Sequence, residues 1–273
     1  MRKIIFLGLY ILLSIQVSQA KSLDEIKNSK TIRIGVWTNQ PPYSNFVDGR
    51  FEGFEVDMAK TIGKNITENG NVELVGITNG SQRIEFLEQD KVDLVIASFT
   101  DTKERRERVN FSLPYFSVAM GAIVNKNRGI TKESDLIGKR IVIQKGTTME
   151  QYVPSLRSSE LIKTDGSIDA FAILREDKAD AYIDDNLVVM AYAIIDREYI
   201  TPSGLRNLGF SSYLGVGIAK DNSELLKAVN QEMIKLSKEG FFRKVFNETF
   251  VPFYKNEVEA KYFLLEDLYS IYG

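Results

Sequence analysis

Short continuous apolar runs alternate along the chain with stretches of helical periodicity. Residues 92–97 (Val-Asp-Leu-Val-Ile-Ala) form a nearly continuous apolar run, as a strand buried in a parallel sheet requires. Residues 54–65 instead carry apolar side chains three and four positions apart, which predicts a helix. With strands at 31–36 and 72–75 and a helix at 82–89, the order is strand, helix, strand, helix, strand. This order is typical of an α/β sheet with right-handed crossovers.

The same alternation begins again near residue 120, so the pattern predicts a second α/β unit. Two such units predict two lobes, and a cleft between lobes is a common place for a small ligand. Residues 121–126 and 215–220 are the expected crossovers, which divides the chain into 21–124 plus 218–273 for lobe 1 and 125–217 for lobe 2. The remaining predicted elements are a helix at 23–29 capped by Ser22, strands at 121–124, 140–143, 179–183 and 215–219, and helices at 149–155, 168–175, 186–195, 223–238 and 241–250.

The first twenty residues have the features of an export signal. Arg2 and Lys3 precede a nearly apolar stretch over residues 4–17, and Ser18-Gln19-Ala20 places small residues before a cut after Ala20. The apolar stretch is too short for a comfortable membrane span, although an uncleaved anchor is the alternative. The cut is not followed by the cysteine that a lipid anchor needs. We therefore expect a soluble protein, not a lipoprotein, in the periplasm.

Composition removes several classes of chemistry. The 273 residues include no cysteine and no histidine. A thiolate nucleophile, a thiolate metal site and an imidazole base are therefore excluded, and any metal would have only oxygen ligands. Lys plus Arg is 35 and Asp plus Glu is 37, a net charge of −2 that does not indicate a nucleic-acid surface. We expect no catalytic residues, no metal and no cofactor.

A motif near residue 54 resembles a known family signature. Gly53-Phe54-Glu55-Val56-Asp57-Met58, followed by Ile62-Gly63, is similar to the signature of solute-binding proteins for polar amino acids in ABC importers. The resemblance covers about residues 31–250, and residues 83–126 and 241–249 look nearest to the Campylobacter-type branch that binds cysteine or acidic amino acids. Its companion motifs are Pro41-Pro42-Tyr43, 91–94 (Lys-Val-Asp-Leu), 100–105 (Thr-Asp-Thr-Lys-Glu-Arg), 109–115 (Val-Asn-Phe-Ser-Leu-Pro-Tyr), 135–139 (Asp-Leu-Ile-Gly-Lys), 145–148 (Lys-Gly-Thr-Thr), 179–181 (Ala-Asp-Ala) and Asp184-Asp185.

The resemblance implies a type II periplasmic binding protein, an α/β protein whose two lobes are joined by two hinge strands and close on one amino acid. The implied partners are the amino acid and an inner-membrane permease, and we expect a monomer. An enzyme on the same fold, similar to cyclohexadienyl dehydratase, is the alternative; Asp185 or Glu55 would then be its acid. Residues 255–273 extend past the usual family end and are rich in aromatic residues, so they either pack along a lobe or form a self-association surface.

A free amino acid is a zwitterion, so its pocket needs a cation and an anion at a fixed separation. Arg105 is the candidate for the ligand carboxylate, because a guanidinium grips a carboxylate with two parallel hydrogen bonds. The resemblance supports this choice, since the family arginine lies six residues before a Phe-Ser pair, here 111–112. By the same resemblance Asp185 receives the ligand ammonium, and Asp184 is the neighbour that could replace it.

Four other residues are candidates for the pocket. Ser98 and Thr100 follow the buried strand at alternate positions and should point to the same side, although their hydroxyls could simply serve local backbone. Thr147 begins a loop into a helix, where free N–H groups favour negative charge. Trp37, the only tryptophan, ends the first strand and is the expected pocket wall, with a core position as the alternative.

Arg83 bears on the ligand side chain. In several relatives that bind aspartate or glutamate, an arginine begins the helix that enters this buried strand, and the same arginine occurs in a cysteine-binding relative. A spare cation would pair with a side-chain carboxylate. The expected ligand is therefore an acidic or small polar L-amino acid, with glutamate or aspartate first, glutamine next and cysteine after.

Overall fold

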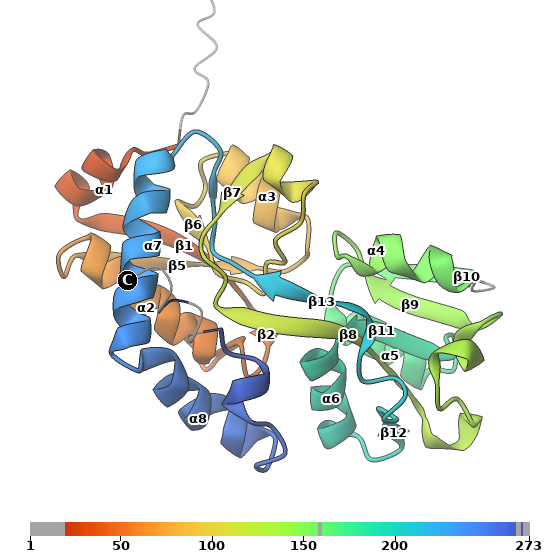
Figure 1. The fold of residues 1–273 in the computed structure, drawn as a ribbon. Coiled ribbons are helices and arrows are strands. Elements are labelled where there is room, and N and C mark those ends of the chain that lie inside the picture. Colours follow the sequence, from red (N-terminus) through yellow and green to blue (C-terminus); the bar gives the residue numbers. More distant parts are fainter. Residues whose placement is uncertain (1–19, 158–159, 266–268, 270–273) are drawn as a thin grey trace, which may run out of the picture.

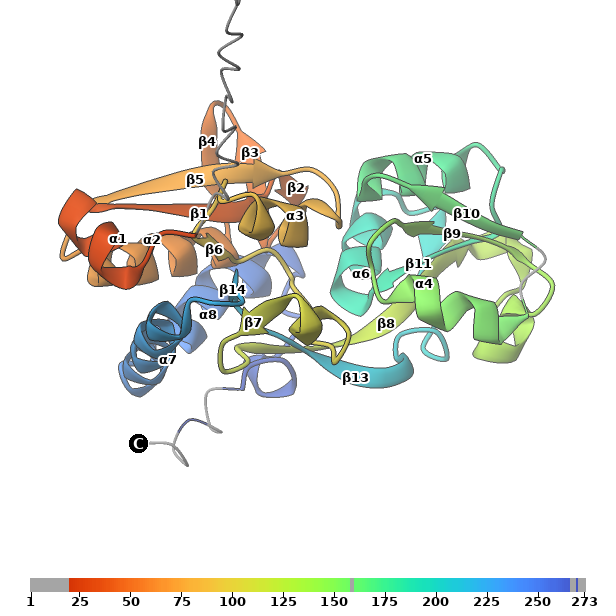
Figure 2. The same cartoon turned by 90° about the horizontal axis from the view of Figure 1, so that it is seen from above.

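Two lobes joined by two neighbouring strands make up the molecule (Figures 1 and 2). The structure is a computed structural model that describes residues 20–157, 160–265 and 269, so the predicted export signal lies almost wholly outside the described residues. The connecting strands are β8 (Phe116–Asn125) and β13 (Leu208–Leu214). The predicted fold class, a two-lobed α/β protein with two hinge strands, is confirmed.

The first lobe is built on a sheet with the strand order β5-β1-β6-β14-β7. β1 (Thr31–Trp37) lies between β5 (Asn71–Ile77) and β6 (Leu94–Val95) and pairs in parallel with both. β14 (Gly217–Ala219) runs antiparallel between β6 and β7 (Val109–Phe111). The lobe also contains helices α1 (Leu23–Ser29), α2 (Phe54–Ile66), α3 (Gln82–Glu88), α7 (Ser223–Lys238) and α8 (Phe241–Phe253), and a small sheet of β2 (Asn39–Gln40), β3 (Ser44–Val47) and β4 (Arg50–Glu52).

The second lobe is built on a sheet with the order β10-β9-β11-β8-β12, and β13 pairs with β8. β9 (Arg140–Gln144) pairs in parallel with β10 (Glu160–Thr164) and β11 (Ala181–Asp185). β8 runs antiparallel to β11 and to β12 (Tyr199–Ile200). The helices are α4 (Met149–Tyr152), α5 (Ser167–Arg175) and α6 (Asn186–Ile195).

Each lobe contains an arginine clamp of the same design near the start of a parallel strand, β1 in the first lobe and β9 in the second. In the first lobe, the Arg33 guanidinium donates to Asp93 and to the Asp90 carbonyl, while the Arg33 N–H donates to Asp93 Oδ2 at 2.7 Å. Arg140 in the second lobe makes the same set of bonds to Asp180 and to the Asp177 carbonyl. The acceptors lie in the matching segments 90–93 (Asp-Lys-Val-Asp) and 177–180 (Asp-Lys-Ala-Asp). Each clamp therefore ties a strand start to the turn before a neighbouring strand.

The crossing between the lobes lies elsewhere than the sequence predicts. β8 pairs along its length within the second sheet, so the first lobe ends near Phe116 and not at residue 124. The return crossing is the paired end of β13, where Leu214 faces Phe116. The predicted crossovers end at Lys126, which follows β8 in the second sheet, and at Lys220, which follows β14 in the first sheet, so both extend beyond the crossing. The run over residues 109–125 contains no charged residue that would have marked the crossing.

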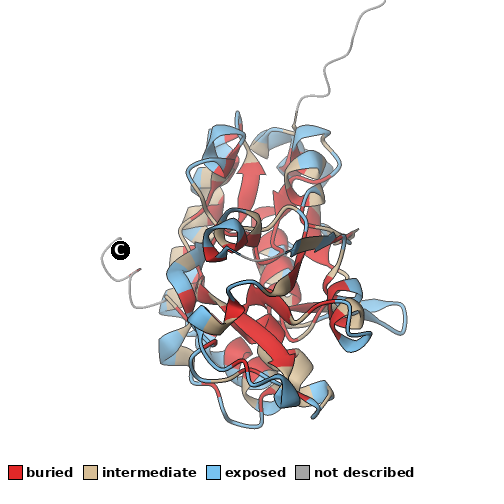
Figure 3. Cartoon of the chain, turned by 90° about the vertical axis from the view of Figure 1, so that its right-hand side faces the viewer, coloured by how far each residue is buried: buried red, intermediate tan, exposed pale blue. Residues whose placement is uncertain are grey.

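A single apolar cluster continues from the first lobe across the hinge. Figure 3 shows that buried residues occur in the strands and helices of both lobes. Phe116, Val118 and Leu214 of the connecting strands belong to it, as do residues of α6 in the second lobe. The described part of the C-terminal tail also packs into this cluster through Leu264 and Tyr269, and the Tyr269 hydroxyl donates to the Pro114 carbonyl at 2.5 Å. Among the residues that the structure describes, no helix is long and apolar enough to cross a membrane.

Candidate functional site

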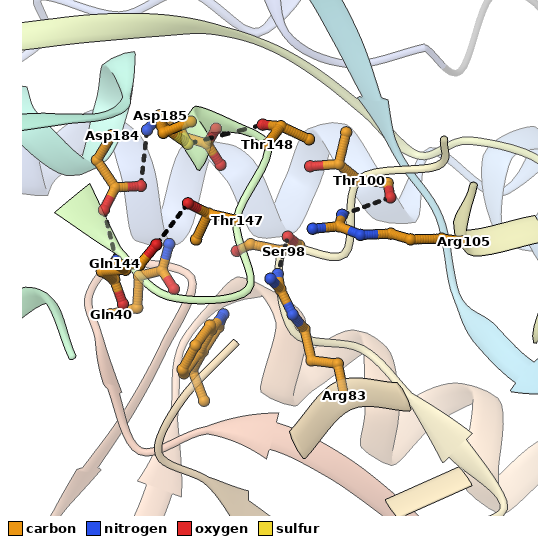
Figure 4. A pocket seen from close by; sticks show the side chains of 12 residues that line it. Gln40, Arg83, Ser98, Thr100, Arg105, Gln144, Thr147, Thr148, Asp184 and Asp185 are labelled. Atoms are coloured by element: carbon orange, nitrogen blue, oxygen red, sulfur yellow. Dashed lines mark hydrogen bonds between the residues drawn. The ribbon is translucent and has the colours of Figure 1, made fainter. Parts of the chain in front are cut away.

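A polar pocket between the lobes brings together all seven residues that the sequence nominates (Figure 4). The cavity left between its side chains is small, about 10 Å³, which is room for about one water molecule. The first lobe contributes the ends of β1 and β6 and the segment before β7, and the second lobe contributes the ends of β9 and β11. The lining residues are Trp37, Gln40, Arg83, Ser98, Thr100, Arg105, Gln144, Thr147, Thr148, Met149, Asp184 and Asp185.

Arg105 is held at the pocket by two carbonyl groups from opposite lobes. Its Nη1 donates to the Thr100 carbonyl at 2.7 Å and its Nη2 to the Gly146 carbonyl at 2.9 Å. The guanidinium also lies 5.2 Å from the centre of the Phe99 ring. Burial, and then the charge of Arg83, lower the pKa of Arg105 to about 9, so the side chain remains a cation at neutral pH. A guanidinium has five N–H donors, so further donors stay available to a ligand.

Arg83 makes more contacts with the protein than a spare cation would. Its Nε donates to the Gly80 carbonyl at 3.1 Å, its Nη1 to the Ser98 carbonyl at 2.8 Å and its Nη2 to the Gly146 carbonyl at 3.0 Å. The guanidinium lies between the rings of Trp37 and Phe99, 5.4 and 5.2 Å from their centres. Arg83 therefore lines the pocket and at the same time fixes the backbone around it.

The two adjacent aspartates at the end of β11 have different surroundings. The Asp184 carboxylate accepts hydrogen bonds from Gln144, from the Tyr182 hydroxyl and from the Asp185 N–H. No donor among the described residues reaches the carboxylate of Asp185, although this residue is buried and lines the pocket. Burial, and then the charge of Asp184, raise the pKa of Asp185 to about 8. Asp185 thus has a free carboxylate to offer, whereas Asp184 does not.

Ser98 faces Glu55 and not only the pocket. β6 ends at Val95, and Ser98 has a φ of 44°, so the strand alternation that predicted a common direction for Ser98 and Thr100 does not extend to Ser98. The Ser98 N–H and hydroxyl donate to Glu55 Oε1 at 2.7 and 3.2 Å. The Tyr115 hydroxyl donates to the same oxygen at 2.5 Å. The Ser98 carbonyl, by contrast, accepts from Arg83.

The other nominated residues lie at the edges of the pocket. Trp37 is 5% exposed, so it serves both as a pocket wall and as part of the lobe core. The Thr147 hydroxyl donates to the Gln144 carbonyl at 2.7 Å, which fixes the loop that follows β9. No hydrogen bond from the Thr100 hydroxyl to a described residue is present, so this group is available to the pocket. Tyr43, from the motif Pro41-Pro42-Tyr43, packs edge-on against Phe250 in the core.

Two glycines bring the lobes into backbone contact beside the pocket. Gly80 belongs to the first lobe and Gly146 to the second. A Cβ at Gly146 would lie 2.8 Å from the Ser81 nitrogen and 2.9 Å from the Gly80 carbonyl carbon. Gly146 also has a φ of +71°, which favours glycine. Its carbonyl accepts from both Arg83 and Arg105, so one carbonyl of the second lobe joins two cations of the first.

Sequence reasoning missed Gln40, Gln144, Thr148 and Met149. Gln40 follows the predicted first strand, and the pair Pro41-Pro42 beside it was the only signal there. Gln144 ends β9, as Asp184 and Asp185 end β11, so the rule that ligands lie at the carboxyl ends of parallel strands could have found it. No group of three or more metal-ligating side chains occurs within residues 20–157, 160–265 and 269.

Comparisons with known proteins agree with the fold. A family model described as bacterial extracellular solute-binding proteins, family 3, matches residues 32–252. The structure is similar to the cysteine-binding protein from Campylobacter jejuni, with a TM-score of 0.83 and 31% identity over 89% of this chain and 98% of the other. An ancestral amino-acid-binding protein, described as a precursor of cyclohexadienyl dehydratase, has a TM-score of 0.74 and 28% identity over 83% and 97%. The glutamine-binding protein of an ABC transporter from Bacillus subtilis is 25% identical over 85% of each chain.

Proposed function

Because the chain belongs to the bacterial extracellular solute-binding proteins of family 3, we propose that it binds one L-amino acid between its lobes and delivers it to the permease of an ABC importer. One observation carries the proposal. A buried cation, Arg105, and a buried carboxyl group that accepts from no described donor, Asp185, line one small pocket from opposite lobes. A zwitterionic ligand satisfies both groups and connects the lobes.

In this proposal Arg105 binds the ligand carboxylate, and Asp185, not Asp184, binds the ammonium. The saturated hydrogen bonding of Asp184 supports this choice. Thr100 and Thr147 stand beside the carboxylate and Trp37 forms a wall. Ser98 contributes mainly through its backbone, since its hydroxyl is directed to Glu55.

The charges around the pocket favour a ligand with a neutral side chain. Arg83 and Arg105 are opposed by Asp184 and Asp185, and Glu55 lies directly behind Ser98. A second carboxylate on the ligand would add negative charge to a buried site that already balances, which is unfavourable. Arg83, the cation that favoured glutamate or aspartate in the sequence, donates to four backbone carbonyls. We therefore place small polar amino acids first, with L-cysteine as the leading candidate, then glutamine, and the acidic pair last.

The same proposal includes the cellular setting. The signal-like residues 1–20 and the family description support export, with cleavage after Ala20 and action in the periplasm. We propose that the protein acts as a monomer, because the described apolar residues Phe263, Leu264 and Tyr269 of the tail pack on the first lobe and leave less apolar surface for self-association.

A thermal-shift screen of residues 21–273 with the twenty common L-amino acids tests the proposal. We expect stabilisation by one or a few small polar amino acids, and none for Arg105→Ala. Stabilisation by none of the twenty would reject amino-acid binding.

An enzyme on the same fold is the alternative function. Its supporting observations are the raised pKa of Asp185, which would let this residue act as an acid, and the similarity to a dehydratase precursor. Glu55, the other acid considered, does not line the pocket. Turnover of prephenate by the purified protein, lost in Asp185→Asn, would support the enzyme instead of the transporter.

A further inference from the structure

The segment from Ala97 to Thr100 forms the floor of the first lobe's half of the pocket, and its backbone conformation sets the positions of both arginines. The Ser98 carbonyl accepts from Arg83 Nη1 at 2.8 Å, and the Thr100 carbonyl accepts from Arg105 Nη1 at 2.7 Å. If this segment moved, the two cations would lose the acceptors that hold them.

Ser98 is in a conformation that serine rarely adopts. Its φ of 44° lies in the left-handed region, where a side chain crowds the backbone and which non-glycine residues occupy only when their surroundings force it. Ser98 is also 3% exposed, so water cannot supply its hydrogen bonds. The local sequence alone does not stabilise this turn, and a neighbouring group must do so.

Glu55 is that neighbour. Its Oε1 accepts from the Ser98 N–H, the Ser98 hydroxyl and the Tyr115 hydroxyl, at 2.7, 3.2 and 2.5 Å. Its Oε2 is buried and has no hydrogen-bond partner among the described residues. All the hydrogen bonds of this carboxylate are therefore accepted by one oxygen, and two of the three come from Ser98 in the pocket floor.

The surroundings of Glu55 act on its charge in opposite directions. It lies in the first turn of α2, a 13-residue helix, where the helix dipole stabilises negative charge. The charge of Arg83 and the bonds from Tyr115 and Ser98 act in the same direction, while burial opposes them and raises the pKa of Glu55 to about 7. Hydrogen bonds to an ionised acceptor are roughly twice as strong as neutral ones.

We propose that Glu55 is a positioning residue of the binding site, whose carboxylate holds Ser98 in its left-handed conformation and thereby fixes the carbonyl groups that orient Arg83 and Arg105. Glu55 does not touch the ligand. The role rests on the proposed function, because it serves the first lobe's half of the amino-acid site.

The test compares Glu55→Gln with the matched control Asp57→Asn. Glutamine keeps the shape and one acceptor oxygen but removes the charge. Asp57 lies in the same helical turn, and its side chain makes no contact with the pocket floor, so its substitution removes a charge without touching Ser98. Amide hydrogen exchange of residues 97–100 is measured by NMR on the protein without added ligand. This readout does not depend on which amino acid is bound, so failure here and failure of the proposed function are distinguishable.

In Glu55→Gln we expect the Ser98 amide to exchange at least tenfold faster than in the wild type, while amides of β9 keep their rates; Asp57→Asn should leave both unchanged. The emission of Trp37, the only tryptophan, should also change in Glu55→Gln, because Arg83 lies over its ring and is held by the Ser98 carbonyl. A general structural role would not move this signal selectively.

Unchanged exchange at Ser98 in Glu55→Gln, or an equal increase across both lobes, would overturn the proposal. If that variant does not fold, Glu55→Asp takes its place. Aspartate keeps the charge but is one methylene shorter, so it should also speed exchange at Ser98, and an unchanged rate would again overturn the proposal.

Discussion

A single methyl group at Gly146 should hold the cleft open. In the structure the Gly146 backbone of the second lobe lies directly against Gly80 and Ser81 of the first. An alanine Cβ would stand 2.8 Å from the Ser81 nitrogen, whereas ordinary contact begins at 3.4 Å. The atoms that it meets include backbone atoms, which cannot rotate away as the end of a side chain can. Relief of the contact therefore requires the lobes to separate locally by about 0.6 Å, the difference between these two distances.

The cost of this separation follows from the bonds that it stretches. Arg83 and Arg105 both donate to the Gly146 carbonyl, at 3.0 and 2.9 Å. A hydrogen bond to a charged group contributes about 1.5–3 kcal/mol, so the loss of both would cost closure about 3–6 kcal/mol. At 1.4 kcal/mol per factor of ten, affinity for a ligand that requires the closed form should fall by about two to four orders of magnitude.

Gly138→Ala provides the control. Gly138 lies in the same lobe with the same φ of +71°, and nothing stands within 4 Å of its Cβ position. Both variants thus carry the left-handed strain of about 1–2 kcal/mol, but only Gly146→Ala meets the opposite lobe. Small-angle scattering should show a larger radius for Gly146→Ala, and calorimetry with the amino acid selected by the thermal-shift screen should show weak binding for this variant alone. Equal radii and equal affinities for the two variants would refute the reasoning.

Four further predictions follow from the site and the clamps. Arg105→Ala should lose about 2–5 kcal/mol of binding free energy, a roughly 30-fold to several thousand-fold loss of affinity. The control is Arg108→Ala, since the salt bridge of Arg108 with Glu88 is exposed; by calorimetry this variant should bind within threefold of wild type. Asp185→Asn should weaken calorimetric binding far more than Gln144→Ala, because only Asp185 offers an unshared carboxylate; a reversed order would contradict the ammonium assignment. The pKa of Asp185 is raised to about 8, and a ligand ammonium needs the ionised carboxylate, so binding should release a proton and the affinity should increase by up to about tenfold per pH unit between pH 6.5 and 8. The same raised pKa means that the unliganded protein loses stability as pH rises from about 4 to 8. An affinity that does not change with pH would contradict this assignment. Arg33→Ala leaves the buried Asp93 without its cation, so it should lower the free energy of unfolding by about 3 kcal/mol in a denaturant titration. Arg140→Ala should lose less, because the Arg140 guanidinium is more exposed. Equal stability of Arg33→Ala and wild type would contradict the clamp.

The sequence predicted the elements that have strong local signals. The helix 23–29 has its predicted Ser22 cap with a full capping box, and the helix at 186–195 is reproduced as predicted. The strand predicted at 92–97 is regular only over Leu94–Val95, although the Asp93 and Ile96 N–H groups also donate to carbonyls of β1. The left-handed conformation of Ser98 follows this segment, and no composition rule predicts a serine there. A hydrophobic pattern indicates that residues are buried, but a residue can be buried without being paired in a sheet.

The crossing and the interior of the site depend on long-range contacts, which the sequence pattern does not contain. β13 (Leu208–Leu214) has exposed apolar residues, such as Phe210, and did not resemble a buried strand. Its place is determined by pairing with β8, about ninety residues earlier in the chain. Arg83 could be nominated from its position before the buried strand, but its bonds to carbonyls of both lobes could not be foreseen. Because these bonds occupy Arg83, it is no longer the spare cation that would pair with a side-chain carboxylate of the ligand.

The arrangement of charges explains why a zwitterionic ligand can bind both lobes at once. Within each lobe the clamp arginine meets its aspartates directly, so those charges are already compensated. Arg105 and Asp185 form no such ion pair across the pocket. Arg105 donates to carbonyl groups instead, and Asp185 accepts from no donor among the described residues. A direct ion pair between Arg105 and Asp185 would close the cleft permanently and leave no room for a ligand. Two buried charges that remain apart instead make closure depend on a molecule that carries the opposite pair, and a neutral side chain then keeps the total charge of the pocket balanced.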